Sequence, residues 1–233
     1  MTDKRFKLDP VDVPKTLKDL AYVSIKEAIL TGSMKQNEFY SEPSLSAMLE
    51  ISRTPTREAL KDLVGEGFVR AIPKRGYQVK SLQPEEVKNL YDYRIPIELA
   101  IIKQVSEKIS DVHLIELENN LRLDRLASEK NDIKSFLENN RHFHSCLASI
   151  TNNNYFIDSV NKILELTEWG ALNVQKRDLR QLRAVKEHEN IYLALKQGDA
   201  EAAYRAMEVH LIVSKKLALK QIADGIQIGI DET

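Results

Sequence analysis

The residues that decide the fold of the first third of the chain are SRTPTREAL, numbers 52–60. Thr54 suits the N-cap of a helix and Pro55 its first turn, because a proline there loses no hydrogen bond. Two glycines stop this helix soon afterwards, and Arg57 lies away from its apolar side. The apolar residues share one arc: Ala59, Leu60, Leu63 and Val64. One face is therefore expected to pack on neighbouring elements, while the other presents cations.

Two further helices and a hairpin surround this helix. Thr16 can cap a helix that ends near Gly32, and Pro43-Ser44 opens a short second helix. After the third helix, two β-rich runs flank a basic turn that contains a glycine, which predicts a hairpin. These runs and their turn are 68–73, Lys74-Arg75-Gly76 and 77–80. Three helices followed by a hairpin are the outline of a winged helix-turn-helix.

A different pattern begins at Pro84, where helical segments follow one another with short breaks. The predicted helices are 84–108, 111–129, 132–151, 154–176, 179–197 and 199–223. We expect a mainly α protein with an N-terminal winged helix-turn-helix and a C-terminal all-helical antiparallel bundle. The predicted divisions are an arm at 1–15, the winged domain at 16–80, a linker at 81–84, the helical domain at 85–223 and a tail at 224–233.

Composition narrows the class of protein. The 233 residues carry a net charge of −1, which excludes a globally basic nucleic-acid coat but not a local basic patch. No run of apolar residues is long enough to span a membrane, and the start has no signal-peptide pattern. The single cysteine, Cys146, forbids an internal disulfide and fits a reducing compartment. We therefore expect a soluble cytoplasmic protein with no membrane contact.

The third helix and the hairpin together indicate a DNA-reading surface. Arginine can bind guanine or phosphate, and hydroxyls and N–H groups at a helix start can hold phosphate. The basic hairpin tip is expected to reach the adjacent minor groove or backbone. The candidate DNA-binding residues are Ser52, Arg53, Thr54, Thr56, Arg57, Lys74, Arg75 and Gly76. The alternative is an ordinary solvated face that carries three cations.

The same residues resemble a known family. SRTPTREAL, with Glu66-Gly67-Phe68-Val69 and the run 75–79 after it, resembles the GntR family of bacterial transcription regulators. The resemblance implies that Arg53, Thr54 and Arg57 contact operator DNA and that Gly76 sits in the wing tip. In some members an arginine on the second helix also touches DNA. Its position here is Pro43, so that contact is expected to be missing.

Four residues of the C-terminal part lie on inward helical stripes and indicate a metal site. Asn140 and His144 are one turn apart. His188 and His210 stand level on either side of the turn at Gly198-Asp199, about 15–17 Å from it at about 1.5 Å per residue. Converging imidazoles with an amide make a divalent-metal site. The alternative is that each histidine is a separately hydrogen-bonded core residue. The two other histidines, His113 and His142, are expected at the surface, and Cys146 in packing.

These motifs extend the resemblance. The patterns Arg94-x-x-x-Glu98, Asn140-x-x-Phe143-His144, Glu187-His188 and Met207-x-x-His210 look like the FCD domain of the FadR-type GntR subgroup. In metal-binding members an Asp and three His hold Zn²⁺, Ni²⁺ or a similar ion, which helps to bind a small carboxylate effector. Asn140 replaces the Asp, so we expect looser metal binding and a more cationic ion. Arg94 is the candidate to pair the carboxylate of the effector.

We therefore predict a homodimeric, metabolite-responsive regulator that binds a palindromic operator and is released from it by a small organic acid. One alternative is a DNA-binding regulator whose C-terminal bundle only dimerises. Another is a mononuclear metal-dependent enzyme. It is disfavoured because a hydrolase wants a general base beside the metal, and the sequence shows no inward-facing carboxylate.

Overall fold

The computed structural model of the chain describes residues 16–171 and 178–231. Two compact units divide between Ser81 and Leu82. The predicted arm at 1–15 and the end of the predicted helix 154–176 lie outside the described residues. None of the helices in the described part is long and apolar enough to cross a membrane.

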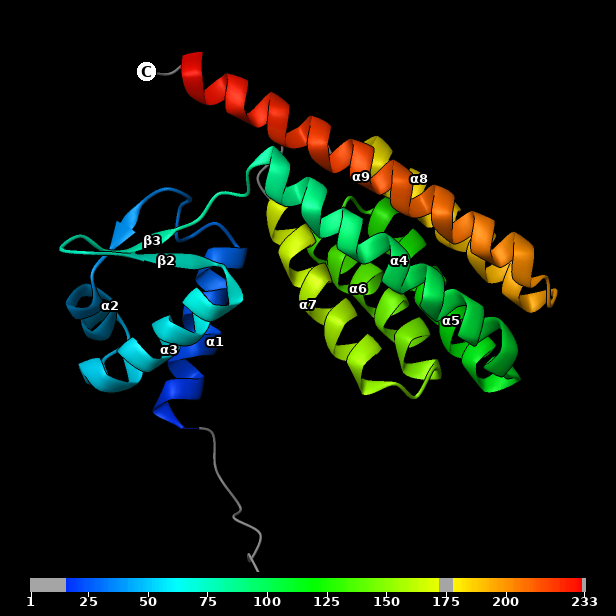
Figure 1. Ribbon diagram of the computed structural model, residues 1–233, viewed down its shortest axis with the longest axis horizontal. Helices are drawn as coiled ribbons and strands as arrows, with labels where there is room; N and C mark the ends of the chain where they lie inside the picture. Colours follow the sequence, from blue (N-terminus) through cyan, green and yellow to red (C-terminus); the bar gives the residue numbers. More distant parts are fainter. Residues whose placement is uncertain (1–15, 172–177, 232–233) are drawn as a thin grey trace, which may run out of the picture. The chain divides into compact units, whose positions relative to one another are not determined.

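The N-terminal unit consists of three helices and a small sheet (Figure 1). Its elements are α1 (Leu17–Leu30), β1 (Phe39–Tyr40), α2 (Glu42–Met48), α3 (Arg53–Glu66), β2 (Val69–Ile72) and β3 (Gly76–Val79). Thr16 caps α1 in a reciprocal capping box with Asp19, so the predicted start of this helix is confirmed. Helices α1 and α3 pack together through their apolar faces, where Ile25, Leu60 and Leu63 are buried.

Two helix starts in this unit differ from the sequence prediction. Helix α3 begins at Arg53 with Ser52 at the N-cap, so Thr54 is already inside the first turn. Helix α2 begins at Glu42 because the hydroxyl of Ser41 accepts a hydrogen bond from the amide of Ser44. The reason is the same in both cases. In each case a serine upstream of the expected first residue has the extended backbone of an N-cap. The helix therefore begins earlier than predicted.

The predicted hairpin is confirmed and gains a third strand. Strands β2 and β3 pair antiparallel from Val69–Val79 to Ile72–Gly76. Strand β1, which the sequence did not predict, pairs with the other edge of β3, giving the order β1-β3-β2. Gly76 has φ +97°, and a Cβ there would lie 2.6 Å from the carbonyl oxygen of Tyr40. The close approach of β1 therefore requires a glycine at the start of β3.

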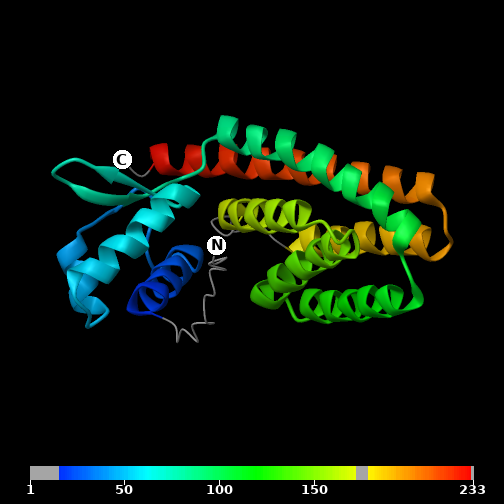
Figure 2. The same ribbon diagram turned by 60° about the horizontal axis from the view of Figure 1, so that its bottom comes forward.

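The C-terminal unit is entirely helical within its described residues. Its helices are α4 (Pro84–Lys108), α5 (Asp111–Glu129), α6 (Ile133–Ile150), α7 (Asn154–Ala171), α8 (Asp178–Lys196) and α9 (Ala200–Asp231). The long helices α4 and α9 run side by side, as both views show (Figures 1 and 2). Helices α8 and α9 form the predicted antiparallel pair, with Gly198 in the left-handed conformation at the turn. The core between the helices includes Ile102, Val105, Leu117, Phe143, Leu147, Leu164, Ile191, Met207 and Leu211.

The last helix is longer than predicted. Helix α9 continues to Asp231, so the tail expected from residue 224 is helical as far as this residue. Gly225 and Gly229 both lie within this last part of the helix. Isolated glycines lower helix propensity by only about 1 kcal/mol each, which is not enough to end a helix that is already formed.

Replacing Gly76 with alanine should destabilise the N-terminal unit by about 1–3 kcal/mol, because the residue must keep a positive φ beside a backbone oxygen. Calorimetric unfolding of the full chain measures this loss. The matched control is Gly65→Ala in α3, where an added Cβ meets nothing within 4 Å. That change should stabilise the unit by about 0.5–1 kcal/mol. Equal melting temperatures of the Gly76→Ala and wild-type proteins would contradict the requirement for glycine at this position.

Candidate DNA-binding surface and metal site

The first two turns of α3 present the predicted arginines to solvent. Arg53 and Thr54 are exposed at the helix start. Arg57 is exposed one turn later, where its Nε and Nη2 donate to the carboxylate of Glu42 on α2 at 2.7–3.1 Å. These hydrogen bonds lower the pKa of the Glu42 carboxyl. The bridge fixes the guanidinium between α2 and α3 and leaves further N–H donors for a partner.

Thr56 does not belong to this surface. Its side chain is fully buried, and its hydroxyl donates to the carbonyl of Ser52 at 3.1 Å. The prediction that Thr56 contacts DNA is therefore corrected, because it faces the inside of the unit beside Ala59 and Leu60. Ser52 itself remains exposed at the N-cap.

The hairpin tip carries the other predicted contacts. Lys74 and Arg75 are exposed, and the guanidinium of Arg75 lies 5.0 Å from the centroid of the Phe39 ring. This cation–π contact holds Arg75 against β1. Gly76 serves the backbone turn, as shown above, and brings no side chain to the surface. Pro43 is exposed in the first turn of α2 and brings no cation to this surface.

Three buried histidines from three helices meet inside the C-terminal unit. His144 comes from α6, His188 from α8 and His210 from α9, and each is at most 2% exposed. One nitrogen from each ring lies within 4.8 Å of the other two. The ring centroids are 4.7–5.3 Å apart. This convergence of imidazoles is the arrangement that was predicted from the level positions of His188 and His210.

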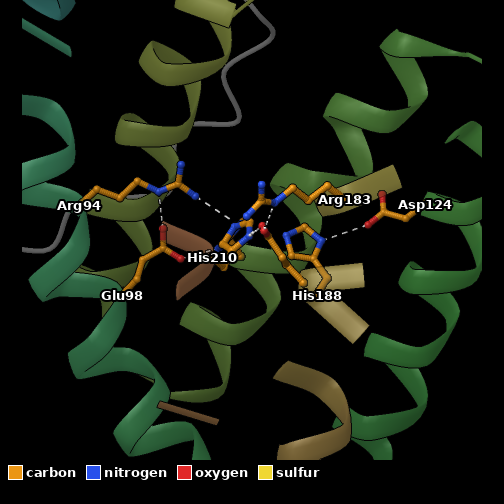
Figure 3. Close-up of polar contacts among 8 residues, drawn as sticks. Arg94, Glu98, Asp124, Arg183, His188 and His210 are labelled. Carbon is orange, nitrogen blue, oxygen red and sulfur yellow. Dashed lines mark hydrogen bonds and ion pairs between the residues drawn. The ribbon is translucent and has the colours of Figure 1, made fainter. Parts of the chain in front are cut away.

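Each ring is backed by a carboxylate on its Nδ1 side, and Figure 3 shows part of this network. His144 Nδ1 pairs with Glu98 of α4, His188 Nδ1 lies 3.3 Å from Asp124 of α5, and His210 Nδ1 lies 2.9 Å from Glu187 of α8. A carboxylate on Nδ1 fixes the proton there and leaves the lone pair on Nε2. His188 Nε2 is buried and has no hydrogen-bond partner. Such an orphaned acceptor beside two other imidazoles fits a bound cation.

A buried ion pair adjoins the cluster on α4. Arg94 Nε donates to Glu98 Oε1 at 2.5 Å, and Arg94 Nη2 lies 3.3 Å from His144 Nε2. Burial raises the pKa of the Glu98 carboxyl, but the charge of Arg94 and the contact with His144 outweigh it and lower the pKa to about 2. Burial lowers the pKa of His144 to about 4, against the attraction of Glu98. His144 is therefore neutral at neutral pH, the form that binds metals.

The remaining candidates of the helical part make no hydrogen bond to the three rings within the described residues. Asn140 is half-buried on α6, one turn before His144. His142 is exposed, with Nε2 3.5 Å from Glu116 Oε1. His113 is partly buried at the start of α5, with Nδ1 near the hydroxyl of Ser110. Cys146 is buried in the core, and this burial raises the pKa of its thiol to about 12.

Comparison with known proteins identifies both units. Residues 17–79 match the model of bacterial regulatory proteins of the gntR family, and residues 89–212 match the FCD domain. The chain belongs to the GntR family of bacterial transcription regulators. It is a DNA-binding regulator with a C-terminal FCD domain, because the matching families and relatives are transcription regulators and not enzymes.

Relatives and a solved structure agree with this assignment. The HTH-type transcriptional repressor RspR of Escherichia coli (strain K12) is 28% identical over 73% of this chain and 75% of its own length. YdhC, an uncharacterized HTH-type transcriptional regulator of Bacillus subtilis (strain 168), is 25% identical over 81% of this chain and 85% of its own. A crystal structure of a GntR regulator from Rhodococcus sp. RHA1 has a TM-score of 0.77 at 24% identity. The match covers 87% of this chain and 97% of the Rhodococcus chain, which shows that the two proteins share a fold.

In this GntR regulator, the carboxylates behind the histidines were missed by sequence reasoning. We expected no inward-facing carboxylate, yet Glu98 and Asp124 are buried. The sequence motifs quoted above contain Glu98 and Glu187, but no role was predicted for either residue. Asp124 lies on one stripe of α5 with Asn120 and Ser128, four residues apart, and this polar stripe was the available signal. All three carboxylates contact Nδ1 atoms, so they orient the rings.

The purified protein is incubated with Zn²⁺ or Ni²⁺ and then desalted. If the three imidazoles hold a metal, His188→Ala should lose most of the metal that the wild type retains, because only two imidazoles remain. Plasma emission spectroscopy measures metal per subunit. The control is His142→Ala on α6, whose ring is exposed and pairs with Glu116. Equal metal in the His188→Ala and wild-type proteins would assign the histidines to core packing alone.

Proposed function

We propose that this protein is a homodimeric repressor whose hold on a palindromic operator is released when a small carboxylate binds beside a divalent metal ion in the FCD domain. The observation that carries the effector and metal part is the convergence of three buried imidazoles, each with a carboxylate on Nδ1. The protein would supply three nitrogen ligands to Zn²⁺ or Ni²⁺, and the effector would fill open positions.

Asn140 is the proposed fourth ligand of the metal ion. It stands one turn from His144 on the same helix, which is the spacing that lets two side chains share a face. An amide oxygen adds no negative charge, so the bound ion would keep more of its positive charge than with an Asp ligand. Arg94, buried beside the cluster, is the proposed partner of the effector carboxylate. Both features favour an anionic effector.

DNA binding is proposed to use Arg53, Thr54 and Arg57 on α3, with Ser52 at the cap and Lys74 and Arg75 on the wing. Thr56 is left out because it is buried. A dimer would bring two such surfaces to the half-sites of a palindrome. The name of the relative RspR as a repressor supports the direction of regulation.

The DNA part is tested by selecting binding sites from random duplexes with the full protein, then measuring affinities for the selected site. We expect a two-fold symmetric site. Arg53→Ala should weaken binding by about 1–3 kcal/mol if the guanidinium reads a base. Arg205→Ala, an exposed arginine of α9 that pairs with Glu201, is the control and should bind as the wild type does. Selected sites without symmetry would contradict the dimeric proposal.

The effector part is tested by fluorescence polarisation of the selected duplex with metal-loaded protein and a panel of small organic acids. We expect one acid to release the duplex saturably, while its amide, which lacks the negative charge, fails. The coupling needed is modest, about 1–3 kcal/mol between the two sites. A panel without any saturable response would indicate that the bundle only dimerises the protein.

A further inference from the structure

Arg94 occupies the position from which a metal would approach His144. Glu98 holds the ring from the other side, because its second carboxylate oxygen pairs with His144 Nδ1 while its first accepts from Arg94 Nε. With the proton of the neutral ring on Nδ1, Nε2 is an acceptor, and Arg94 Nη2 lies 3.3 Å from it. The three side chains thus form a closed triangle in which Arg94 donates to the lone pair on Nε2.

A metal ion needs that same lone pair. Zinc binds imidazole nitrogen at about 2.0–2.1 Å along the direction that the N–H donor of Arg94 now takes. The side chain of Arg94 is 5% exposed, so water would screen little of the repulsion between its guanidinium and a divalent ion. The lone pair of His144 Nε2 therefore cannot accept a hydrogen bond from Arg94 and bind a metal ion at the same time. Arg94 must turn away before the third imidazole becomes a ligand.

We propose that Arg94 is a gate that competes with the metal ion for His144, and that an anionic effector opens the gate by drawing the guanidinium away. This inference rests on the proposed metal and effector site. It makes metal and carboxylate mutually dependent, since each binds better once the other has changed the partner of Arg94. By linkage, the factor by which the acid tightens metal binding equals the factor by which the metal tightens acid binding.

The protein contains a matched pair for comparison on the other side of the cluster. Arg183 donates to Glu187 at 2.8 Å, and Glu187 accepts from His210 Nδ1 at 2.9 Å, as Arg94 and Glu98 do for His144. The side chain of Arg183, however, is 55% exposed, whereas that of Arg94 is 5% exposed. Figure 3 shows both arginines beside the histidines. Removing either one deletes a positive charge near the cluster, but only Arg94 is buried against a ring nitrogen that the metal needs.

The test is calorimetric titration of the metal-stripped full protein with Ni²⁺ alone. Arg94→Met should bind Ni²⁺ about tenfold more tightly than the wild type, since it removes a charge-assisted hydrogen bond to a ligand atom. Arg183→Met controls for the loss of charge and should gain much less. Ni²⁺ binding by Arg94→Met where the wild type shows none would also support the gate.

Two other results overturn it. Equal or weaker Ni²⁺ binding by Arg94→Met refutes the gate and leaves the proposed metal site standing. Failure of both proteins to bind Ni²⁺ refutes the gate together with the metal site. Because Arg94→Met leaves Glu98 buried without this partner, circular dichroism first checks that the variant folds.

A second measurement on the wild type is independent of that folding. Ni²⁺ is titrated in sodium acetate and in sodium chloride at equal ionic strength, with the acetate–Ni²⁺ complex in solution taken into account. The gate predicts tighter Ni²⁺ binding in acetate for the wild type and for Arg183→Met, because acetate offers Arg94 a carboxylate. Identical affinities in the two salts would refute the release of Arg94 by an anion.

Discussion

Three imidazole–carboxylate pairs hold the centre of the FCD domain together. Each pair joins a different pair of helices: His144 to Glu98 links α6 with α4, His188 to Asp124 links α8 with α5, and His210 to Glu187 links α9 with α8. A buried polar group without its partner costs about 1–3 kcal/mol, so these pairs fix which faces of the helices meet. The apolar core of the bundle surrounds this polar centre.

The same pairs make the centre of the domain suitable for regulation. Five helices contribute to the histidines and their carboxylates, so a ligand bound at this point contacts the elements that define the packing of the bundle. The carboxylates contact the Nδ1 atoms, whereas the free lone pair of His188 is on Nε2. One ring nitrogen therefore orients the imidazole, and the other is left to bind a ligand. Arg94 belongs to both roles, since it neutralises Glu98 and contacts His144 Nε2.

The N-terminal unit follows a simpler logic. Its helices bury apolar faces against each other, and its exposed arginines are placed by local contacts. Glu42 fixes Arg57 from the neighbouring helix, and the ring of Phe39 contacts Arg75 from the added strand β1. These partners are distant from the cations in the sequence and have no role in a motif. They orient two of the side chains that we propose contact DNA.

Except at the end of α9, the sequence by itself determined the helix boundaries within a few residues. It also determined the hairpin, the family and the three histidines, because periodicity, capping residues and turn glycines act locally. It did not determine that Thr56 is buried, that β1 joins the sheet, or that α9 continues beyond residue 224. Nor did it assign the acids that orient the rings. Glu98 and Asp124 are 46 and 64 residues from their histidines, and such pairings exist only once the helices have packed.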